Sequence, residues 1–163
     1  MQIARSRGAR VTAVCGPGNV ELMESLGVER VLDYTVSDFT TEDERYDVIF
    51  GVNGYRSLGQ YRRCLAPGGR YVMIGGGGRQ LFEALLLGRL RFLFSGKTAT
   101  TLTIDGARRA DDLATLAGML DAGELTPEIE HVFSLDQARE AITFVEQGHV
   151  RGKVIFRIAG SGA

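Results

Sequence analysis

The segment Tyr46-Asp-Val-Ile-Phe-Gly-Val52 and the residues up to Gly75 give the clearest indication of the fold. Residues 56–65 have a helical pattern, Ala66-Pro-Gly-Gly69 is a turn, and Arg70-Tyr-Val-Met-Ile-Gly75 is a second apolar run. Both runs are almost continuously apolar, which is typical of strands in a parallel sheet that is covered on both faces. A helix that joins two parallel strands makes a right-handed crossover. These residues therefore predict an α/β fold with a parallel sheet and helices on both faces.

The N-terminal part of the chain shows the same alternation. Residues 1–8 are predicted to be the last turns of a helix, and Ala9-Arg-Val-Thr-Ala-Val-Cys15 a buried strand. A turn then leads into a helix that Asn19 can cap, because asparagine is favoured at that position. Val31-Leu-Asp33 is a short strand that precedes Tyr46. Strands therefore alternate with helices from the first residues, as a parallel α/β sheet requires.

The second half continues with further helices and strands. The predicted elements are a helix near 81–87, a strand at Leu90–Phe94, a helix capped by Asp105, a strand at Ile129–Phe133, a helix that ends at Gly148, and a last strand at Lys153–Ile158. Ser134 and Gln137 have the spacing of a capping box, which opens the helix before Gly148. The threonine-rich residues 97–103 have no clear pattern. We expect one domain over residues 1–158 and a flexible tail at 159–163.

Composition and charge exclude several classes of function. The chain has 19 basic and 20 acidic residues among 163, so the net charge of −1 gives no footprint for nucleic acid or an anionic membrane. No apolar run approaches the roughly 20 residues that cross a bilayer. Cys15 and Cys64 match no metal-binding spacing, and two reduced thiols are typical of the cytoplasm. The sequence therefore predicts a soluble cytoplasmic protein without metal, nucleic acid or membrane partners.

Five segments in order resemble the medium-chain dehydrogenase/reductase family, in its quinone-oxidoreductase-like, zinc-independent branch. They are Gln2-Ile-Ala-Arg-Ser-Arg-Gly-Ala-Arg-Val-Thr-Ala-Val-Cys15, Leu26-Gly-Val-Glu-Arg-Val-Leu-Asp-Tyr34, Tyr46-Asp-Val-Ile-Phe50, Leu65-Ala-Pro-Gly-Gly-Arg-Tyr-Val-Met-Ile-Gly75 and Gly148-His-Val-Arg-Gly-Lys-Val-Ile155. The resemblance covers almost the whole chain. It implies the C-terminal Rossmann domain only, without the first strand and the glycine-rich turn that hold a dinucleotide diphosphate.

The resemblance implies the cofactor-binding domain of an NAD(P)H-dependent oxidoreductase. Members of the quinone or enone reductase and alcohol dehydrogenase type transfer hydride from the nicotinamide, and an N-terminal GroES-like domain makes most substrate contacts. In the family, the last strand, Lys153–Ile158, returns to that domain. We expect this chain alone to bind cofactor weakly and to have little or no activity.

The resemblance also implies which residues touch the cofactor. Gly16 lies where the fold reads the adenosine ribose, and Tyr34 matches a position near the 2′-phosphate of NADP. Val52 and Asn53 approach the cofactor ribose, Ile74, Gly75, Gly76, Phe94 and Lys97 lie on the nicotinamide side, and Asn19 is also expected to contact the cofactor. The first strand ends at Cys15 with no Asp or Glu for the ribose hydroxyl of NAD, so we expect NADP to be preferred over NAD. Gly51 stands where relatives commonly have Asp. No residue is nominated as catalytic, because hydride transfer is chemistry of the cofactor.

Two alternatives to this interpretation remain. The first is a noncatalytic interaction module or dimerising fragment, because a missing first strand exposes the centre of a sheet. A homodimer or a separate N-terminal half would then cover the open edges. The second is a truncated SAM-dependent methyltransferase, since Leu65-Ala-Pro-Gly-Gly69 before a strand also resembles that fold. His131 and His149 have no third ligand near them in the sequence, so neither histidine predicts a metal site.

Overall fold

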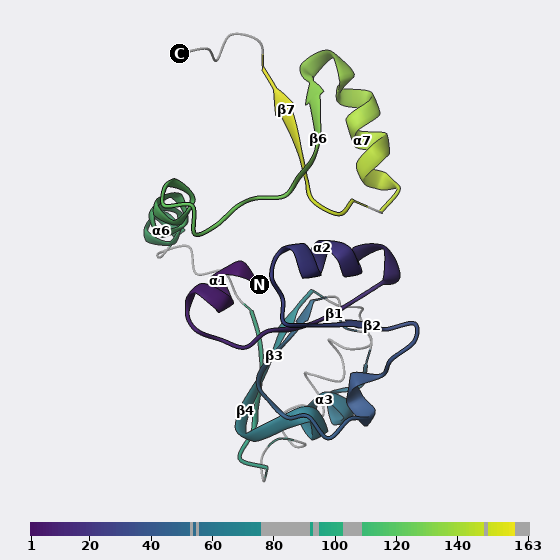
Figure 1. Ribbon diagram of the computed structural model, residues 1–163, viewed down its shortest axis with the longest axis vertical. Helices are drawn as coiled ribbons and strands as arrows, with labels where there is room; N and C mark the ends of the chain where they lie inside the picture. The colour runs from purple at the N-terminus through teal and green to yellow at the C-terminus, as the bar shows by residue number, and fades with distance from the viewer. Residues whose placement is uncertain are drawn as a thin grey trace. The chain divides into compact units, whose positions relative to one another are not determined.

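A computed structural model describes residues 1–52, 54, 56–75, 92, 95–102, 109–148 and 150–158 (Figure 1). The chain divides into two compact units. The central unit contains Thr12–Val20 and Arg30–Arg109. The terminal unit contains Met1–Val11, Glu21–Glu29 and Ala110–Ala163.

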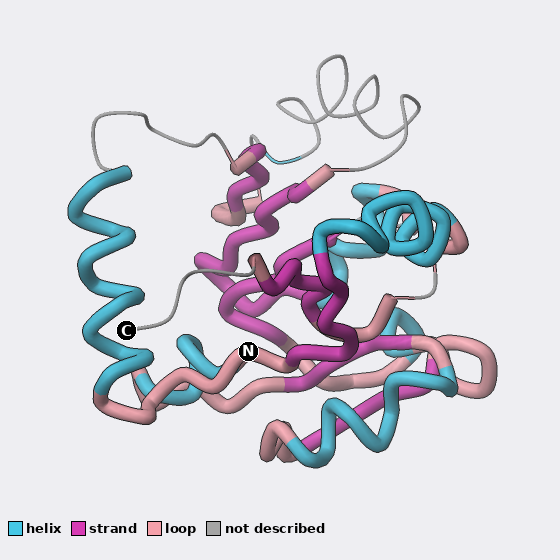
Figure 2. Tube along the Cα trace, turned by 90° about the horizontal axis from the view of Figure 1, so that it is seen from above, coloured by secondary structure: helices cyan, strands magenta, loops and turns pink. Residues whose placement is uncertain are grey.

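The described strands of the central unit form two parallel sheets. In the first, β1 (Thr12–Cys15) pairs with β2 (Arg30–Asp33). In the second, β3 (Tyr46–Val52) pairs with β4 (Leu65–Ile74), which pairs with β5 (Thr98–Thr101). The tube in Figure 2 traces these strands in magenta and the helices in cyan. The predicted α/β fold with parallel strands and flanking helices is confirmed.

The helix between β3 and β4 has a complete capping box at its N-terminus. In α3 (Leu58–Cys64), the backbone N–H of Gln60 donates to Ser57 Oγ at 3.4 Å, and the N–H of Ser57 donates to Gln60 Oε1 at 3.0 Å. Two N–H groups that a helix end leaves unpaired are thereby satisfied. The predicted helix over 56–65 is confirmed with slightly shorter ends.

The predicted turn Ala66–Gly69 is an excursion inside β4. Tyr46 pairs with Leu65 and Val48 pairs with Arg70, so the residues between Leu65 and Arg70 leave the ladder. Gly68 has a φ of +76°, which side chains rarely adopt. The excursion returns β4 to β3 in register.

The core of the central unit lies on one face of β3 and β4. Its buried side chains come from one 3₁₀ turn, one helix, β4 and the single residue Phe92: Phe39, Leu58, Tyr61, Cys64, Leu65, Tyr71, Met73 and Phe92. Phe39 belongs to the 3₁₀ turn η2 (Phe39–Thr41), and Leu32 and Ile49 pack against the cluster from β2 and β3. Both sheets of the central unit therefore share one core.

The opposite face of β3 is open to solvent. Val48, Phe50 and Val52 alternate with Ile49 and Gly51, and their exposures are 48%, 59% and 64%. The expectation that apolar strands would be covered on both faces was therefore wrong for this strand. An alternating burial pattern means that only one side of β3 packs on the core.

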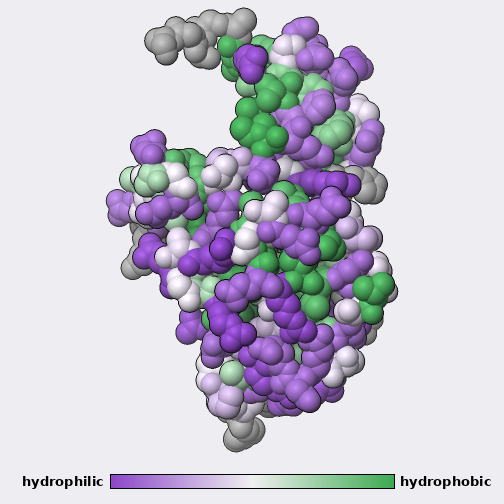
Figure 3. All heavy atoms as spheres, viewed as in Figure 1, coloured by the Kyte–Doolittle hydropathy of each residue, from purple (hydrophilic) through white to green (hydrophobic). Residues whose placement is uncertain are grey.

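The terminal unit combines short helices with a two-stranded parallel sheet. Its elements are α1 (Gln2–Ser6), most of α2 (Val20–Ser25) and α6 (Arg109–Asp121), β6 (Ile129–Ser134), η5 (Leu135–Gln137), α7 (Ala138–Glu146) and β7 (Lys153–Arg157). Phe144 of α7 packs on Phe133 of β6, with ring centroids 6.1 Å apart. Figure 3 shows hydrophobic side chains at the surface over β6 and β7, where Val132 and Ile155 are 43% and 39% exposed.

The predicted ends of the last helix are confirmed. Ser134 N and Oγ donate to Gln137 Oε1 at 3.1 and 2.9 Å, and Gly148 has a φ of +72° where the helix stops. Phe92 is helical, so the predicted strand at Leu90–Phe94 was wrong at that residue. The helix near 81–87, Asp105 and the tail at 159–163 lie outside the described residues.

Candidate functional site

The carboxyl ends of β1 and β2 bring two predicted site residues together. A Cβ atom built on Gly16 would lie 3.0 Å from the hydroxyl oxygen of Tyr34, so the Tyr34 ring lies against the Gly16 backbone. The Tyr34 N–H donates to the carbonyl of Cys15 at 3.0 Å and extends the pairing of the two strands. Tyr34 is 48% exposed. A small residue and an aromatic ring therefore form a flat, accessible surface at the edge where parallel α/β sheets bind ligands.

Asn19 lies beside this surface in a different role from the one expected. It is the last residue of the 3₁₀ turn η1 (Pro17–Asn19), and its N–H donates to the carbonyl of Gly16 at 3.0 Å. Its Oδ1 atom is buried and accepts no hydrogen bond within the described part of the chain. The predicted cap on the following helix was therefore wrong. A buried acceptor without a donor is uncommon in proteins and calls for a partner.

An acidic side chain that sequence reasoning missed stands at the same edge. Asp33 pairs with Cys15 across β1 and β2, and its Oδ1 accepts from the N–H and the hydroxyl of Thr35, both at 2.8 Å. Burial and then the Asp33 charge raise the pKa of the Cys15 thiol. Cys15 is therefore a neutral thiol. The sequence could have indicated Asp33 as a neighbour of Cys15, because the last residues of two adjacent parallel strands lie side by side.

The carboxyl ends of β3 and β4 hold three more predicted residues. Val52 pairs with Ile74, and both are the last residues of their strands. Gly75 follows with a φ of +67°, a conformation that glycine adopts readily. Gly16, Asn19, Tyr34, Val52, Ile74 and Gly75 thus all lie at strand carboxyl ends in one unit. Asn53, Gly76 and Phe94 lie outside the described residues.

Tyr71 explains why residue 51 is glycine. A Cβ atom on Gly51 would lie 2.3 Å from the Tyr71 hydroxyl oxygen, and one on Gly54 would lie 2.5 Å from that of Tyr61. The two tyrosine rings stack with centroids 4.5 Å apart. Burial, and to a smaller extent Tyr61, raise the pKa of Tyr71 to about 12. A neutral, buried phenol therefore occupies the space in which a side chain at residue 51 would lie.

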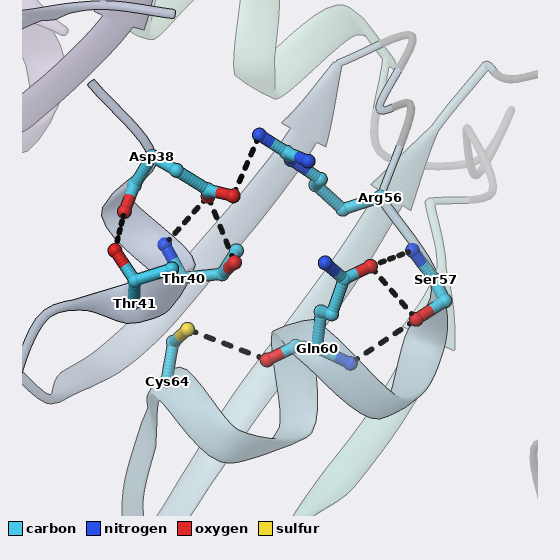
Figure 4. A network of polar contacts seen from close by, with 7 residues as sticks. All are labelled: Asp38, Thr40, Thr41, Arg56, Ser57, Gln60 and Cys64. Carbon is cyan, nitrogen blue, oxygen red and sulfur yellow. Dashed lines mark hydrogen bonds and ion pairs between the residues drawn. The ribbon is translucent and has the colours of Figure 1, made fainter.

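A polar network joins the segment that follows β2 to the segment that follows β3 (Figure 4). Arg56 and Asp38 form an ion pair of 2.9 Å. Asp38 also accepts from the N–H and the hydroxyl of Thr40, at 3.0 and 2.8 Å. Burial acts to raise the pKa of Asp38, but the hydrogen bonds from Thr40 and the Arg56 charge outweigh it and the pKa is lowered. The network fixes the turn after β3 to the segment after β2.

Lys97 lies at the amino ends of the parallel strands, whereas the other described site residues lie at the carboxyl ends. It precedes β5, so it stands where the parallel strands begin. Its Nζ donates to the carbonyls of Arg62 and Leu65 at 2.9 and 2.6 Å. These carbonyls end α3, where a cation is favourable. The described contacts therefore give Lys97 a helix-capping role.

We predict that Lys97→Met will lower the free energy of unfolding by about 2 kcal/mol, because two hydrogen bonds from a charged donor are lost. Urea denaturation followed by circular dichroism measures this. Lys153→Met is the matched control, because Lys153 is exposed, and should change the free energy by less than about 0.5 kcal/mol. Equal effects of the two variants would show that the Lys97 contacts do not stabilise the fold.

Two hollows and one aromatic cluster lie elsewhere. One hollow lies between β6 and α7, and the other on the open face of β3, β4 and β5. His131 packs on Phe133 and Phe144, at ring centroid distances of 4.6 and 5.2 Å.

In the described ranges, no cluster of three or more His, Cys, Asp or Glu side chains could hold a metal ion. None of the helices described there is long and apolar enough to cross a membrane.

Comparison with known proteins gives a consistent set of matches. Residues 26–156 match the sequence model of a family described as zinc-binding dehydrogenase. The chloroplastic quinone-oxidoreductase QR1 of Triphysaria versicolor is 26% identical over 95% of this chain and 47% of its own length. The mitochondrial NAD(P)H oxidoreductase RTN4IP1 of Danio rerio is 28% identical over 97% of this chain and 45% of its own length. The chain therefore spans about half the length of the curated relatives it matches.

Solved structures show the same fold. The crystal structure of an NAD-dependent alcohol dehydrogenase superposes with a TM-score of 0.77 at 23% identity, over 97% of this chain and 46% of the other. That of a quinone oxidoreductase from Coxiella burnetii gives a TM-score of 0.72 at 22% identity, over 95% and 47%. At these identities the likeness is one of fold.

Proposed function

Since the chain belongs to the zinc-binding dehydrogenase family, we propose that it is the nicotinamide-dinucleotide-binding part of an oxidoreductase of the quinone reductase, enone reductase or alcohol dehydrogenase type. One observation carries the proposal: Gly16, Tyr34, Val52 and Ile74 all lie at the carboxyl ends of parallel strands in one unit. Open α/β sheets bind dinucleotides at that edge. The family match decides against the methyltransferase alternative. The described residues offer no zinc ligand set, so the proposal uses no metal.

The side chains at this edge fit an adenosine and its ribose. The Tyr34 ring on the Gly16 backbone gives a flat surface with space for a close approach. The buried Asn19 Oδ1 accepts from no described donor, and a ribose hydroxyl would satisfy it. The exposed Val52 would approach a ribose of the cofactor, and the Gly75 turn would approach the nicotinamide end. The nicotinamide, when bound, supplies the hydride. The role of these residues is to bind and orient the cofactor.

The preferred cofactor is NADPH, and its phosphate lies at Tyr34. The absence of an acid at Cys15 removes the usual partner of the NAD ribose hydroxyl. The Asp33 carboxylate at the neighbouring strand end opposes this preference, because it would repel a phosphate. A preference for NADPH therefore needs a contact that outweighs this repulsion, and we propose that the Tyr34 hydroxyl donates a hydrogen bond to the 2′-phosphate.

We predict that Tyr34→Phe will weaken NADPH binding about fivefold, the equivalent of one hydrogen bond, and leave NADH binding within about twofold. Parallel calorimetric titrations with the two cofactors measure the ratio, with NADH as the internal control. An equal loss for both cofactors would place the 2′-phosphate away from Tyr34.

Titration of the whole chain with NADPH tests the proposed function itself. We expect saturable binding weaker than micromolar and little or no reductase activity, because the described residues include no glycine-rich turn for the diphosphate. Absence of saturable binding at millimolar NADPH would contradict the proposal. Micromolar or tighter binding would contradict the expected weakness.

A second candidate function is an interaction module or dimerising fragment. For either function we propose a cytoplasmic location. The exposed Val48, Phe50 and Val52 on β3 favour the second candidate, since contiguous apolar surface marks contact sites. A homodimer or a separate N-terminal half would cover such surface. Analytical ultracentrifugation at micromolar concentration tests self-association, and a monomer would count against the homodimer.

A further inference from the structure

Tyr71 of β4 carries a buried hydroxyl group that has no hydrogen-bond partner within the described part of the chain. The residue is 1% exposed and is among the largest fully buried side chains described. A buried donor without an acceptor loses the hydrogen bonds that water would give it, and this loss destabilises the fold. Such groups are rare in folded proteins, so the Tyr71 hydroxyl calls for an explanation.

The hydroxyl lies toward the carboxyl end of β3. Tyr71 pairs with Ile49 across β4 and β3, but a Cβ atom on Gly51, two residues further along β3, would lie 2.3 Å from its hydroxyl oxygen. A Cβ atom on Gly54, which follows the strand, would lie 3.4 Å from the same oxygen. The Tyr71 side chain therefore leans along β3 and places its donor against the turn that follows this strand.

Only backbone separates the hydroxyl from this turn at the two glycines. Gly51 is buried and Gly54 is partly exposed, and neither has a side chain that could come between. Tyr71 itself is held in place, because its ring stacks on Tyr61 with centroids 4.5 Å apart. Glycine permits close approach of the backbone, so a small movement of the turn can bring a carbonyl group to the fixed donor.

We propose that Tyr71 is a positioning residue for the dinucleotide, and that its hydroxyl donates to a backbone carbonyl of the turn after β3 only when a cofactor ribose lies at that edge. This inference rests on the proposed function, in which Val52 at the end of β3 approaches a ribose. In the free chain the donor is unpaired. In the bound chain the turn closes on the ribose and pairs the donor, so binding favours the closed turn.

Tyr71→Phe tests the inference, because it removes the hydroxyl and keeps the ring. The melting temperature of the free chain should rise by about 2–4 °C, since an unpaired buried donor is removed. The dissociation constants for NADPH and NADH should both increase about fivefold, because the two cofactors share the ribose. Thermal denaturation followed by circular dichroism and calorimetric titration measure the two effects. A tyrosine that only packs the core would not give higher stability together with weaker binding.

Tyr46→Phe is the matched control. The Tyr46 hydroxyl is also buried, but it lies beside Thr12 at the start of β3, away from the carboxyl end. This substitution should leave both dissociation constants within about twofold. An equal loss of affinity in the two variants would show that the Tyr71 hydroxyl has no specific role at the cofactor edge.

Other results would also overturn the inference. A lower melting temperature for Tyr71→Phe would show that the hydroxyl already has a partner in the free chain, such as an ordered water. Unchanged affinity in Tyr71→Phe, with clear binding to the unchanged chain, would overturn this inference and leave the proposed function standing. A loss for NADPH alone would place the contact at the 2′-phosphate. If the unchanged chain binds neither cofactor, the proposed function fails and this inference fails with it.

Discussion

Gly51→Ala will lower the free energy of unfolding by about 3 kcal/mol, which is the upper range for inserting a methyl group into a packed core. The new Cβ would lie 2.3 Å from the Tyr71 hydroxyl oxygen and within 2.8 Å of two ring carbons. Tyr71 is 1% exposed and its ring stacks on Tyr61, so it cannot move aside without disturbing the core. Urea denaturation followed by circular dichroism measures the loss.

Gly118→Ala is the matched control for that substitution. Gly118 lies inside α6, and a Cβ atom built there meets nothing within 4 Å. Alanine should stabilise this helix by about 0.5–1 kcal/mol, because it restricts the unfolded chain and favours helix. The two identical substitutions should therefore act in opposite directions. A neutral Gly51→Ala would show that Tyr71 does not occupy the space above residue 51.

A strand and glycine-rich turn placed ahead of Met1 will tighten NADPH binding by about a hundredfold. The turn and the helix start after it would offer backbone N–H groups to the diphosphate. Two charge-assisted hydrogen bonds at about 1.5 kcal/mol each account for this factor. Calorimetric titration of the chain with and without the extension measures it.

The control replaces the glycines of the added turn with valine and keeps the strand. Such a turn cannot approach the diphosphate closely, so binding should return to the level of the unextended chain. Two outcomes contradict the prediction: tight binding without the extension, and tight binding with the valine turn. Either would mean that the diphosphate is held by residues other than the added turn.

The sequence was sufficient to predict the elements that have a strong apolar pattern. Strands β3 and β4 and the helix between them are indicated by continuous apolar runs separated by a turn. The capping box of Ser134 and Gln137 is indicated by residue type and spacing alone. β5 could not be predicted in the same way, because Thr98–Thr101 is exposed throughout and has no apolar alternation.

The placement of side chains within the site needed the structure. Sequence order puts Lys97 near a segment assigned to the nicotinamide side, but its Nζ reaches the carbonyls that end α3. Gly51 looked like the loss of a polar contact, whereas Tyr71 from the next strand fills that space. Asp33 becomes a neighbour of Cys15 only through strand pairing. Contacts between strands depend on register, which composition and periodicity do not give.

NMR mapping of NADPH binding on the isotope-labelled chain is the sharpest test of the proposed cofactor site. Weak binding is no obstacle, because amide shifts report contacts at millimolar ligand. We expect the largest shift changes at Gly16, Tyr34 and Gly75, at the carboxyl ends of the strands, and none at Lys97. Largest changes around Lys97, or in the hollow between β6 and α7, would contradict the assignment of this edge as the cofactor site.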